Sequence, residues 1–248
     1  MAHNDLRYKM SRLKANTNQF FNQIKTKNLD DKGRFIFEID LNDDRIKKSG
    51  LLQLDNKDFI ELQNKLPPSF IDFIKNYSDG LYIDIANALT IFPVGKQNDA
   101  IGWSTILGNT KEVIKYGFFS SKEFIFFAQT GVDSEMFAFY TGVKFNNGEY
   151  PIVWFTPGST DTESFVLVNS SFDKFLTTHY YWLVFTAYYD YNEPIATLEE
   201  NNKNGQNFID KLYDTFDPNI PKPNYNFYEA AVSFEELKKQ IENLKIGF

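Results

Sequence analysis

LPPSFIDFIKNYSDG, residues 66–80, and EFIFFAQTGVDSEMFAFY, residues 123–140, are the two stretches that decide the fold. The first predicts a helix that begins at a Leu-Pro step, because proline fits the first helical position, where no N–H donor is needed. Ile71 and Ile74 are spaced to face a core, and Gly80 suits the left-handed conformation that follows a last helical turn. The second stretch predicts a hairpin of two apolar strands around a turn at residues 131–134.

Other short elements extend this pattern in both directions. Strands are predicted at residues 123–129, 135–142, 150–156 and 164–168, with a turn at Asn146-Asn147-Gly148, and such close spacing predicts an antiparallel meander. Before the meander we expect a helix at 56–65, a strand at 89–94, a loop at 95–108 and a helix at 110–117. Because helices precede and follow the strands, the predicted class is α+β, an antiparallel meander sheet flanked by helices.

The helix after the meander predicts how the end of the chain is used. One apolar stripe runs along it, formed by Phe172, Phe175, Leu176, His179, Trp182 and Leu183, and from Tyr180 onward its other face is apolar too. A helix that is apolar all round must be covered on both sides. The segment 193–248 is the candidate cover, ending in a helix with a capping box at residues 233–236; a partner-binding helix is the alternative.

We therefore divide the chain into a basic amino-terminal arm at 1–28, an α+β domain at 29–192 and a helical carboxy-terminal extension at 193–248 that packs on the domain. The basic side chains of the arm are Arg7, Lys9, Arg12, Lys14, Lys25 and Lys27. The chain as a whole carries a net charge of −7, so its body is acidic. An acidic body disfavours direct nucleic-acid binding and favours basic partners, although it also serves simply to keep a Phe-rich protein soluble.

Composition excludes several classes of function. The 248 residues include no Cys, so the chain has no disulfide, no thiolate nucleophile and no Cys-based metal site. Neither a signal peptide nor an apolar run long enough to insert into a membrane is visible, which predicts a cytoplasmic protein. No phosphate-binding glycine loop occurs. We expect no cofactor and no metal.

The order of these segments resembles the SUKH superfamily. The resemblance is carried by the Leu66-Pro67 helix start, the hairpin at 125–140, the strand start Pro151-Ile152-Val153 and the helix start at 171–176, in this order. The chain departs from the family where many members have Asn-Gly-Gly after the first helix and it has Ser78-Asp79-Gly80. The superfamily consists mostly of bacterial immunity proteins, with a yeast regulator of cell-wall glucan synthesis among its members.

The resemblance implies a noncatalytic immunity protein that neutralises a cognate polymorphic toxin, such as a nuclease or another nucleic-acid-modifying enzyme, by binding it. A regulatory adaptor in cell-wall or signalling control is the alternative. Catalysis lacks its usual residues: His3 lies near the start, and His179 lies on an apolar stripe typical of a core histidine. Asp161 and Glu163 could form a carboxylate pair, but they lie in a polar loop typical of a solvated turn.

Candidate partner-binding residues fall in three places. Residues 34–41 predict a half-exposed strand whose polar face holds Glu38 and Asp40, and Asp43 and Asp44 follow in the next turn. Such a cluster would attract a basic toxin; a solvated acidic edge that discourages strand pairing is the alternative.

The other two places are loops. Trp103, in the loop at 95–108, is either an aromatic anchor for a partner or a plug of the core. Asp133 and Glu135 lie at the turn of the predicted hairpin, where a partner could contact them.

Overall fold

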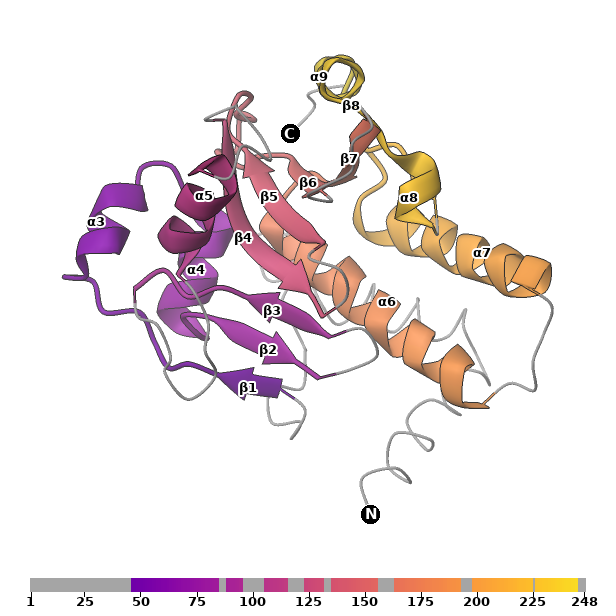
Figure 1. Ribbon diagram of the computed structural model, residues 1–248, viewed down its shortest axis with the longest axis horizontal. Coiled ribbons are helices and arrows are strands. Elements are labelled where there is room, and N and C mark those ends of the chain that lie inside the picture. Colours follow the sequence, from indigo (N-terminus) through magenta and orange to yellow (C-terminus); the bar gives the residue numbers. More distant parts are fainter. Residues whose placement is uncertain are drawn as a thin grey trace.

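One antiparallel sheet, with its strands in sequence order from β1 to β8, organises the protein (Figure 1). The computed structural model describes residues 46–84, 88–95, 105–115, 123–131, 135–155, 163–192, 198–224 and 226–244. The strands are β1 (Ile46–Lys48), β2 (Leu81–Ile83), β3 (Leu89–Ile91), β4 (Phe124–Thr130), β5 (Met136–Tyr140), β6 (Ile152–Phe155), β7 (Glu163–Asn169) and β8 (Val232–Ser233). The described helices are α3 (Lys57–Leu62), α4 (Pro68–Asn76), α5 (Ile106–Lys115), α6 (Phe172–Asn192), α7 (Leu198–Phe216), α8 (Phe227–Ala230) and α9 (Phe234–Glu242). The predicted α+β class is confirmed.

Local sequence signals explain where several helices begin. Asn56 caps α3, since its side-chain oxygen accepts hydrogen bonds from the N–H groups of Asp58 at 2.8 Å and Phe59 at 3.2 Å. Helix α4 begins at Pro68, as the Leu-Pro step predicts. Ser233 caps α9 by accepting from the Glu236 N–H at 3.2 Å, which confirms the cap expected there.

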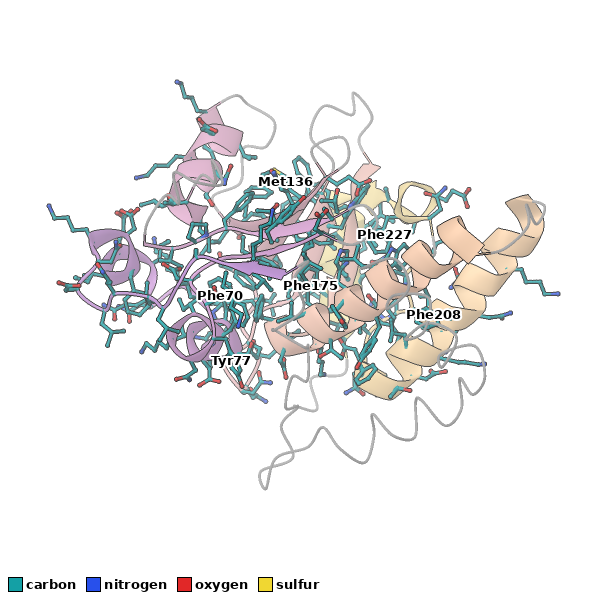
Figure 2. The ribbon with its side chains drawn as sticks, turned by 90° about the horizontal axis from the view of Figure 1, so that it is seen from below. Phe70, Tyr77, Met136, Phe175, Phe208 and Phe227 are labelled. Atoms are coloured by element: carbon teal, nitrogen blue, oxygen red, sulfur yellow. The ribbon has the colours of Figure 1, made fainter. Side chains whose placement is uncertain are left out.

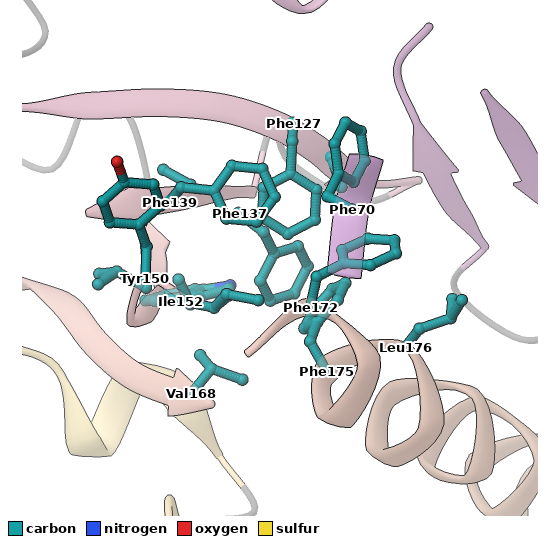
Figure 3. Close-up of a cluster of buried hydrophobic side chains, with 14 of the residues drawn as sticks. Phe70, Phe127, Phe137, Phe139, Tyr150, Ile152, Val168, Phe172, Phe175 and Leu176 are labelled. Atoms are coloured by element: carbon teal, nitrogen blue, oxygen red, sulfur yellow. The ribbon is translucent and has the colours of Figure 1, made fainter. Parts of the chain in front are cut away.

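Helices α4 and α6 pack together on one face of the sheet, over an aromatic core (Figure 3). Phe127 and Phe139 of neighbouring strands stack with centroids 4.1 Å apart, and Phe172 of α6 meets Phe70 of α4 edge to face at 4.8 Å. All four side chains are fully buried. Offset and edge-to-face ring pairs of this kind add about 0.5–1.5 kcal/mol each beyond the burial of their area. This core holds the two helices against the centre of the sheet.

The opposite face is covered by α5 and α9. Helix α5 packs on β4, and the Thr110 hydroxyl accepts a hydrogen bond from the Phe126 N–H at 3.1 Å, where the β4–β5 register shifts. Helix α9 packs on β7 and places Phe234 against Phe124 and Phe165, at 5.6 and 5.7 Å between ring centroids. Both faces of the sheet are therefore covered at its centre.

The carboxy-terminal segment packs along α6 and on the far end of the sheet. Helix α7 packs against α6, where Phe216 stacks on Tyr181 with ring centroids 5.9 Å apart. Phe227 of α8 contacts Trp182 and Trp154, at 5.4 and 5.7 Å, and β8 pairs with β7. Figure 2 shows Phe208 and Phe227 at the α7 side of the molecule, away from Tyr77 and Phe70.

The structure corrects four details of the sequence interpretation. Helix α5 begins at Ile106 rather than Thr110, so part of the expected loop at 95–108 is helical. Strands β1, β2 and β8 were not predicted, because each has only two or three residues. Gly80 does have a positive φ of 105°, but it lies in the turn into β2 and not directly after α4. Strand β5 is also shorter than the predicted strand at 135–142, since it begins at Met136, one residue later, and ends at Tyr140.

Candidate functional site

Glu149 is a buried carboxylate that joins the starts of two helices. Pro67 gives α4 no side-chain cap, and the Glu149 side chain takes that role: its oxygens accept from the Ser69 N–H at 2.8 Å and from the Ser69 hydroxyl at 2.7 Å. It also accepts a hydrogen bond from the N–H of Phe172, the first residue of α6. Burial raises the pKa of Glu149, while the hydrogen bonds from Ser69 act in the opposite direction. A carboxylate at the start of a helix stabilises that helix, so the role of Glu149 is structural.

Asp79 is a buried carboxylate that holds the backbone just after β3. Its two carboxylate oxygens accept hydrogen bonds from the N–H groups of Val94 at 2.7 Å and Gly95 at 3.0 Å. Burial raises the pKa of Asp79, and these two hydrogen bonds oppose that rise. The Asn56 side chain donates to the Gly95 carbonyl from the other side. Asp79 and Asn56 together therefore fix the backbone at Val94 and Gly95.

Asp217 is fully buried after the last turn of α7 and binds the start of α6. Its oxygens accept from the Ser170 N–H at 2.7 Å and the Ser170 hydroxyl at 2.8 Å, and also from the Asn169 amide at 3.2 Å. The Lys174 ammonium forms an ion pair with Asp217 at 3.0 Å. Burial, followed by the charge of Asp217, raises the pKa of Tyr213 one turn earlier. This network ties the carboxy-terminal segment to the end of β7.

His179 is a core residue, as its position on the α6 stripe predicts. Its ring meets Phe137 edge to face at 5.0 Å and stacks on Phe175 at 5.3 Å, and Nε2 has no hydrogen-bond partner among the described residues. Burial lowers the pKa of His179 to about 3. The imidazole is therefore neutral at physiological pH.

The buried carboxylates of Glu149, Asp79 and Asp217 thus stabilise the fold, because each accepts hydrogen bonds from the chain's own backbone. Glu163 begins β7, and Asp161, its imagined catalytic partner, lies outside the described residues. In the part of the chain that the structure describes, no three His, Cys, Asp or Glu side chains are grouped so that they could hold a metal ion. Nor is any helix there long and apolar enough to cross a bilayer.

Of the predicted partner-binding residues, Glu135 is the one that the structure describes. It is half-buried, and its carboxylate accepts a hydrogen bond from the Thr130 hydroxyl at 3.0 Å, across the end of the β4–β5 hairpin. The backbone repeats this link, because the Thr130 N–H donates to the Glu135 carbonyl at 3.0 Å. Glu135 therefore closes the hairpin. The other predicted residues, Glu38, Asp40, Asp43, Asp44, Trp103 and Asp133, lie outside the described residues.

Four large apolar side chains that sequence analysis did not single out are exposed in the described part of the chain. Leu51, Leu54 and Ile60 are 61%, 60% and 53% exposed, and Tyr77 is 37% exposed. Within the described part of the chain these are the exposed large apolar residues, and all four fall in the segment from the end of β1 to the end of α4. We call these four residues the apolar corner.

Backbone hydrogen bonds hold the apolar corner in place. The Leu52 N–H donates to the Ile74 carbonyl at 3.2 Å, and the Asp79 N–H donates to the Gly50 carbonyl at 2.6 Å. These bonds hold the segment after β1, which contains Leu51, against the end of α4 and the residues that follow it. Helix α3, which carries Ile60, lies near α4, since the Lys75 ammonium of α4 is 5.5 Å from the centre of the Phe59 ring (Figure 1).

Exposed charged residues of both signs lie near the residues of the apolar corner in the sequence. Its exposed charged neighbours in sequence are Asp55, Lys57, Glu61, Lys65, Asp72 and Lys75. An apolar centre within a polar rim is the usual anatomy of a protein–protein contact, whereas a catalytic site needs a concave pocket with polarised groups. No single sign of charge dominates this rim.

The sequence holds only weak signals for the exposed apolar residues and for the buried Asp217. Leu54 and Ile60 sit two residues before and four residues after the Asn56 cap, where apolar residues also serve ordinary helix packing. Asp217 is the stronger signal, because a carboxylate at the carboxyl end of a helix opposes the helix dipole and calls for a compensating partner.

The fold and these residues define an antiparallel α+β scaffold whose buried carboxylates hold helix ends and whose described surface exposes four large apolar side chains. Residues 60–178 match the model of the SMI1 / KNR4 family (SUKH-1). This match, which covers just under half of the chain, places residues 60–178 in the SUKH superfamily, as their resemblance predicts. A search of curated proteins found no significant match.

Proposed function

We propose that the chain is a noncatalytic immunity protein that acts in the cytoplasm by binding and neutralising a cognate protein toxin, such as a nuclease or another nucleic-acid-modifying enzyme. The observation that carries this proposal is the SMI1 / KNR4 (SUKH-1) match over residues 60–178, a family that resemblance links mainly to toxin immunity. A binding role also agrees with the state of the ionisable groups. Glu149, Asp79 and Asp217 accept hydrogen bonds within the fold, and His179 is buried and neutral.

The apolar corner is the surface that we assign to the toxin. Leu51, Leu54 and Ile60 are each more than half exposed. Burying them against the toxin would remove their apolar area from water, which stabilises the complex by about 25 cal/mol per Å². Rigid anchors suit such a contact, and here the hydrogen bonds of Leu52 and Asp79 fix the backbone on either side. The expected occupant is an apolar patch of the toxin with a polar rim.

The acidic residues at 38–44 and the loop residues Trp103 and Asp133 remain additional candidates for the contact. A basic toxin would be attracted by the acidic residues before it docks, and that attraction would weaken as salt screens it. The apolar corner would then decide how long the complex lasts, because affinity differences arise mostly in the dissociation rate.

A regulatory adaptor in cell-wall or signalling control is the second candidate. It is favoured by the description of the matched family as SMI1 / KNR4, the branch that the resemblance connects with the yeast regulator. An adaptor would also bind a protein through an apolar surface, so geometry alone does not separate the two roles.

Co-expression with the toxin domain encoded beside this gene separates them. Immunity predicts that bacteria producing that toxin domain survive when they also produce this chain, and that Ile60→Lys weakens the protection. A matched control is Asn207→Lys, which adds the same charge at an exposed position on α7. If no toxin is encoded there, or if the chain gives no protection, the immunity proposal fails and the adaptor becomes the better account.

A further inference from the structure

Asn56 and Asp79 hold the same residue, Gly95, from two sides. The Asp79 carboxylate accepts hydrogen bonds from the N–H groups of Gly95 at 3.0 Å and Val94 at 2.7 Å. The Asn56 amide donates to the Gly95 carbonyl. Asn56 lies just before α3, Asp79 lies between α4 and β2, and Gly95 follows β3. Three segments of the chain therefore meet at one residue, and we call Asn56, Asp79 and Gly95 the Gly95 clamp.

The clamp is closely packed around its glycine. A Cβ added to Gly95 would lie 3.0 Å from the Asn56 side chain and 3.2 Å from Oδ2 of Asp79. Both separations are shorter than the optimal distance between non-bonded heavy atoms, which is about 3.5–4.0 Å for carbon. Any larger residue at this position would therefore push the two side chains away from the backbone that they hold.

The clamp fixes both ends of the segment 50–56, which carries two exposed leucines of the apolar corner. At its beginning, the Asp79 N–H donates to the Gly50 carbonyl at 2.6 Å. At its end, the Asn56 amide is bonded to Gly95. Fixing both ends reduces the number of conformations open to the segment, so less entropy is lost when a partner binds it.

Asn56 extends the same restraint into α3. Its side-chain oxygen caps the helix by accepting from the N–H groups of Asp58 and Phe59, while its nitrogen donates to Gly95. One side chain thus joins the first turn of α3 to the chain that follows β3. Helix α3 carries Ile60 and has only six residues, and a helix of that length is not stable by itself. Its position therefore depends on contacts with the rest of the domain.

We propose that Asn56 and Asp79 are positioning residues of the apolar corner. Their joint hold on Gly95 sets where Leu54 and Ile60 are presented to a partner. Both residues act through the backbone rather than by contact with that partner. The inference rests on the proposed toxin-binding function for the identity of the partner, whereas the clamp itself restrains α3 in the free protein.

Asn56→Ser tests the clamp in the free, full-length protein. Serine caps helices as well as asparagine does, but it has no amide to donate to the Gly95 carbonyl. Hydrogen exchange should be followed by NMR at the amides of Ile60 and Gln63, which are bonded within the α3 region at 3.0 and 2.7 Å. We expect both to exchange about five- to tenfold faster, because one hydrogen bond that opposes the opening of α3 is lost.

Two further variants separate the clamp from a general loss of stability. Asn226→Ser is the matched control, because it removes an amide just before α8, at the opposite end of the molecule from α3 (Figure 1). It should leave exchange in α3 at the native rate. Gly95→Ala keeps both polar side chains but forces them away from the backbone, so it should speed exchange in α3 as Asn56→Ser does.

Affinity for the purified toxin domain encoded beside this gene measures the consequence for binding. Asn56→Ser should raise the dissociation constant about five- to tenfold, whereas Asn226→Ser should not change it. In a chain that also carries Leu54→Ala and Ile60→Ala, Asn56→Ser should change the constant by less than about twofold, because the side chains that it positions have been removed. A purely structural role would give the same loss in both backgrounds.

Each outcome decides a different part of the proposal. Native exchange rates in α3 of Asn56→Ser, or equal acceleration by Asn226→Ser, would overturn the clamp. An unchanged dissociation constant, or a loss that persists in full without Leu54 and Ile60, would overturn the positioning role. If the native chain does not bind the toxin domain, the proposed function fails, while hydrogen exchange still decides whether the clamp restrains α3.

Discussion

His179 makes the stability of this protein depend on pH in a predictable direction. Burial between Phe137 and Phe175 lowers the pKa of His179 to about 3, against an ordinary value of 6.5 in the unfolded chain. Because the folded-state pKa is depressed, the unfolded chain binds this proton more tightly. The contribution of His179 to stability is therefore present above pH 6.5 and is lost progressively as the pH falls toward 3.

The expected magnitude follows from the two pKa values. Between pH 7.5 and pH 5.0, protonation of the unfolded chain at this one site removes about 2 kcal/mol from the free energy of unfolding. For a chain of this size such a loss lowers the melting temperature by about 4–8 °C. Asp79 and Glu149, whose pKa values burial raises, act in the opposite direction, since their contributions increase as the pH falls.

The assay compares the native protein with His179→Leu, which cannot titrate, by urea denaturation at both pH values. The other titrating groups are the same in both proteins, so the difference between their two pH dependences isolates His179. The native protein should lose about 2 kcal/mol more than the variant on acidification. Equal losses, or a signal assigned to the His179 imidazole that titrates near pH 6.5 by NMR, would refute the placement of His179 in the core.

Asp217→Ala should lower the free energy of unfolding by about 3–5 kcal/mol, because it leaves Lys174 and the Ser170 N–H without their buried partner. The exposed Asp214→Ala is the control and should lower it by under about 0.5 kcal/mol in the same thermal or chemical unfolding experiment. Similar losses in both variants would contradict the account. Gly148→Ala should lower stability by more than Gly50→Ala. Both glycines have positive φ, at 87° and 99°, but a Cβ at Gly148 would lie 3.0 Å from Pro68, whereas Gly50 has open space around it. Equal losses would mean that φ alone matters.

Helix starts and the main strands could be predicted because their signals are local. The Asn56 and Ser233 caps and the Pro68 helix start each depend on residues within one turn, and β4 and β5 are long enough to show their apolar character. The family resemblance rests on the order of these same segments, and for that reason it too was visible in the sequence.

The missed features depend on residues that are far apart in the chain. Strands β1 and β2 have three residues each and are defined by pairing with one another across more than thirty positions. Asp217 is bonded to Ser170, 47 positions away, and Glu149 caps a helix that begins about 80 positions earlier. Exposure is equally non-local: whether Leu54 or Ile60 reaches the core depends on what the rest of the chain places over it.

The central claim is that a protein partner docks on the apolar corner. Its most direct test measures, by isothermal titration, the dissociation constant of the purified toxin domain encoded beside this gene. The constant is measured for three proteins: the native chain, the Leu54→Lys variant and the Asn207→Lys control. We predict that Leu54→Lys weakens binding by about 2 kcal/mol or more, roughly 30-fold, with an unchanged melting temperature, while Asn207→Lys binds like the native chain. Native affinity in Leu54→Lys would contradict the account.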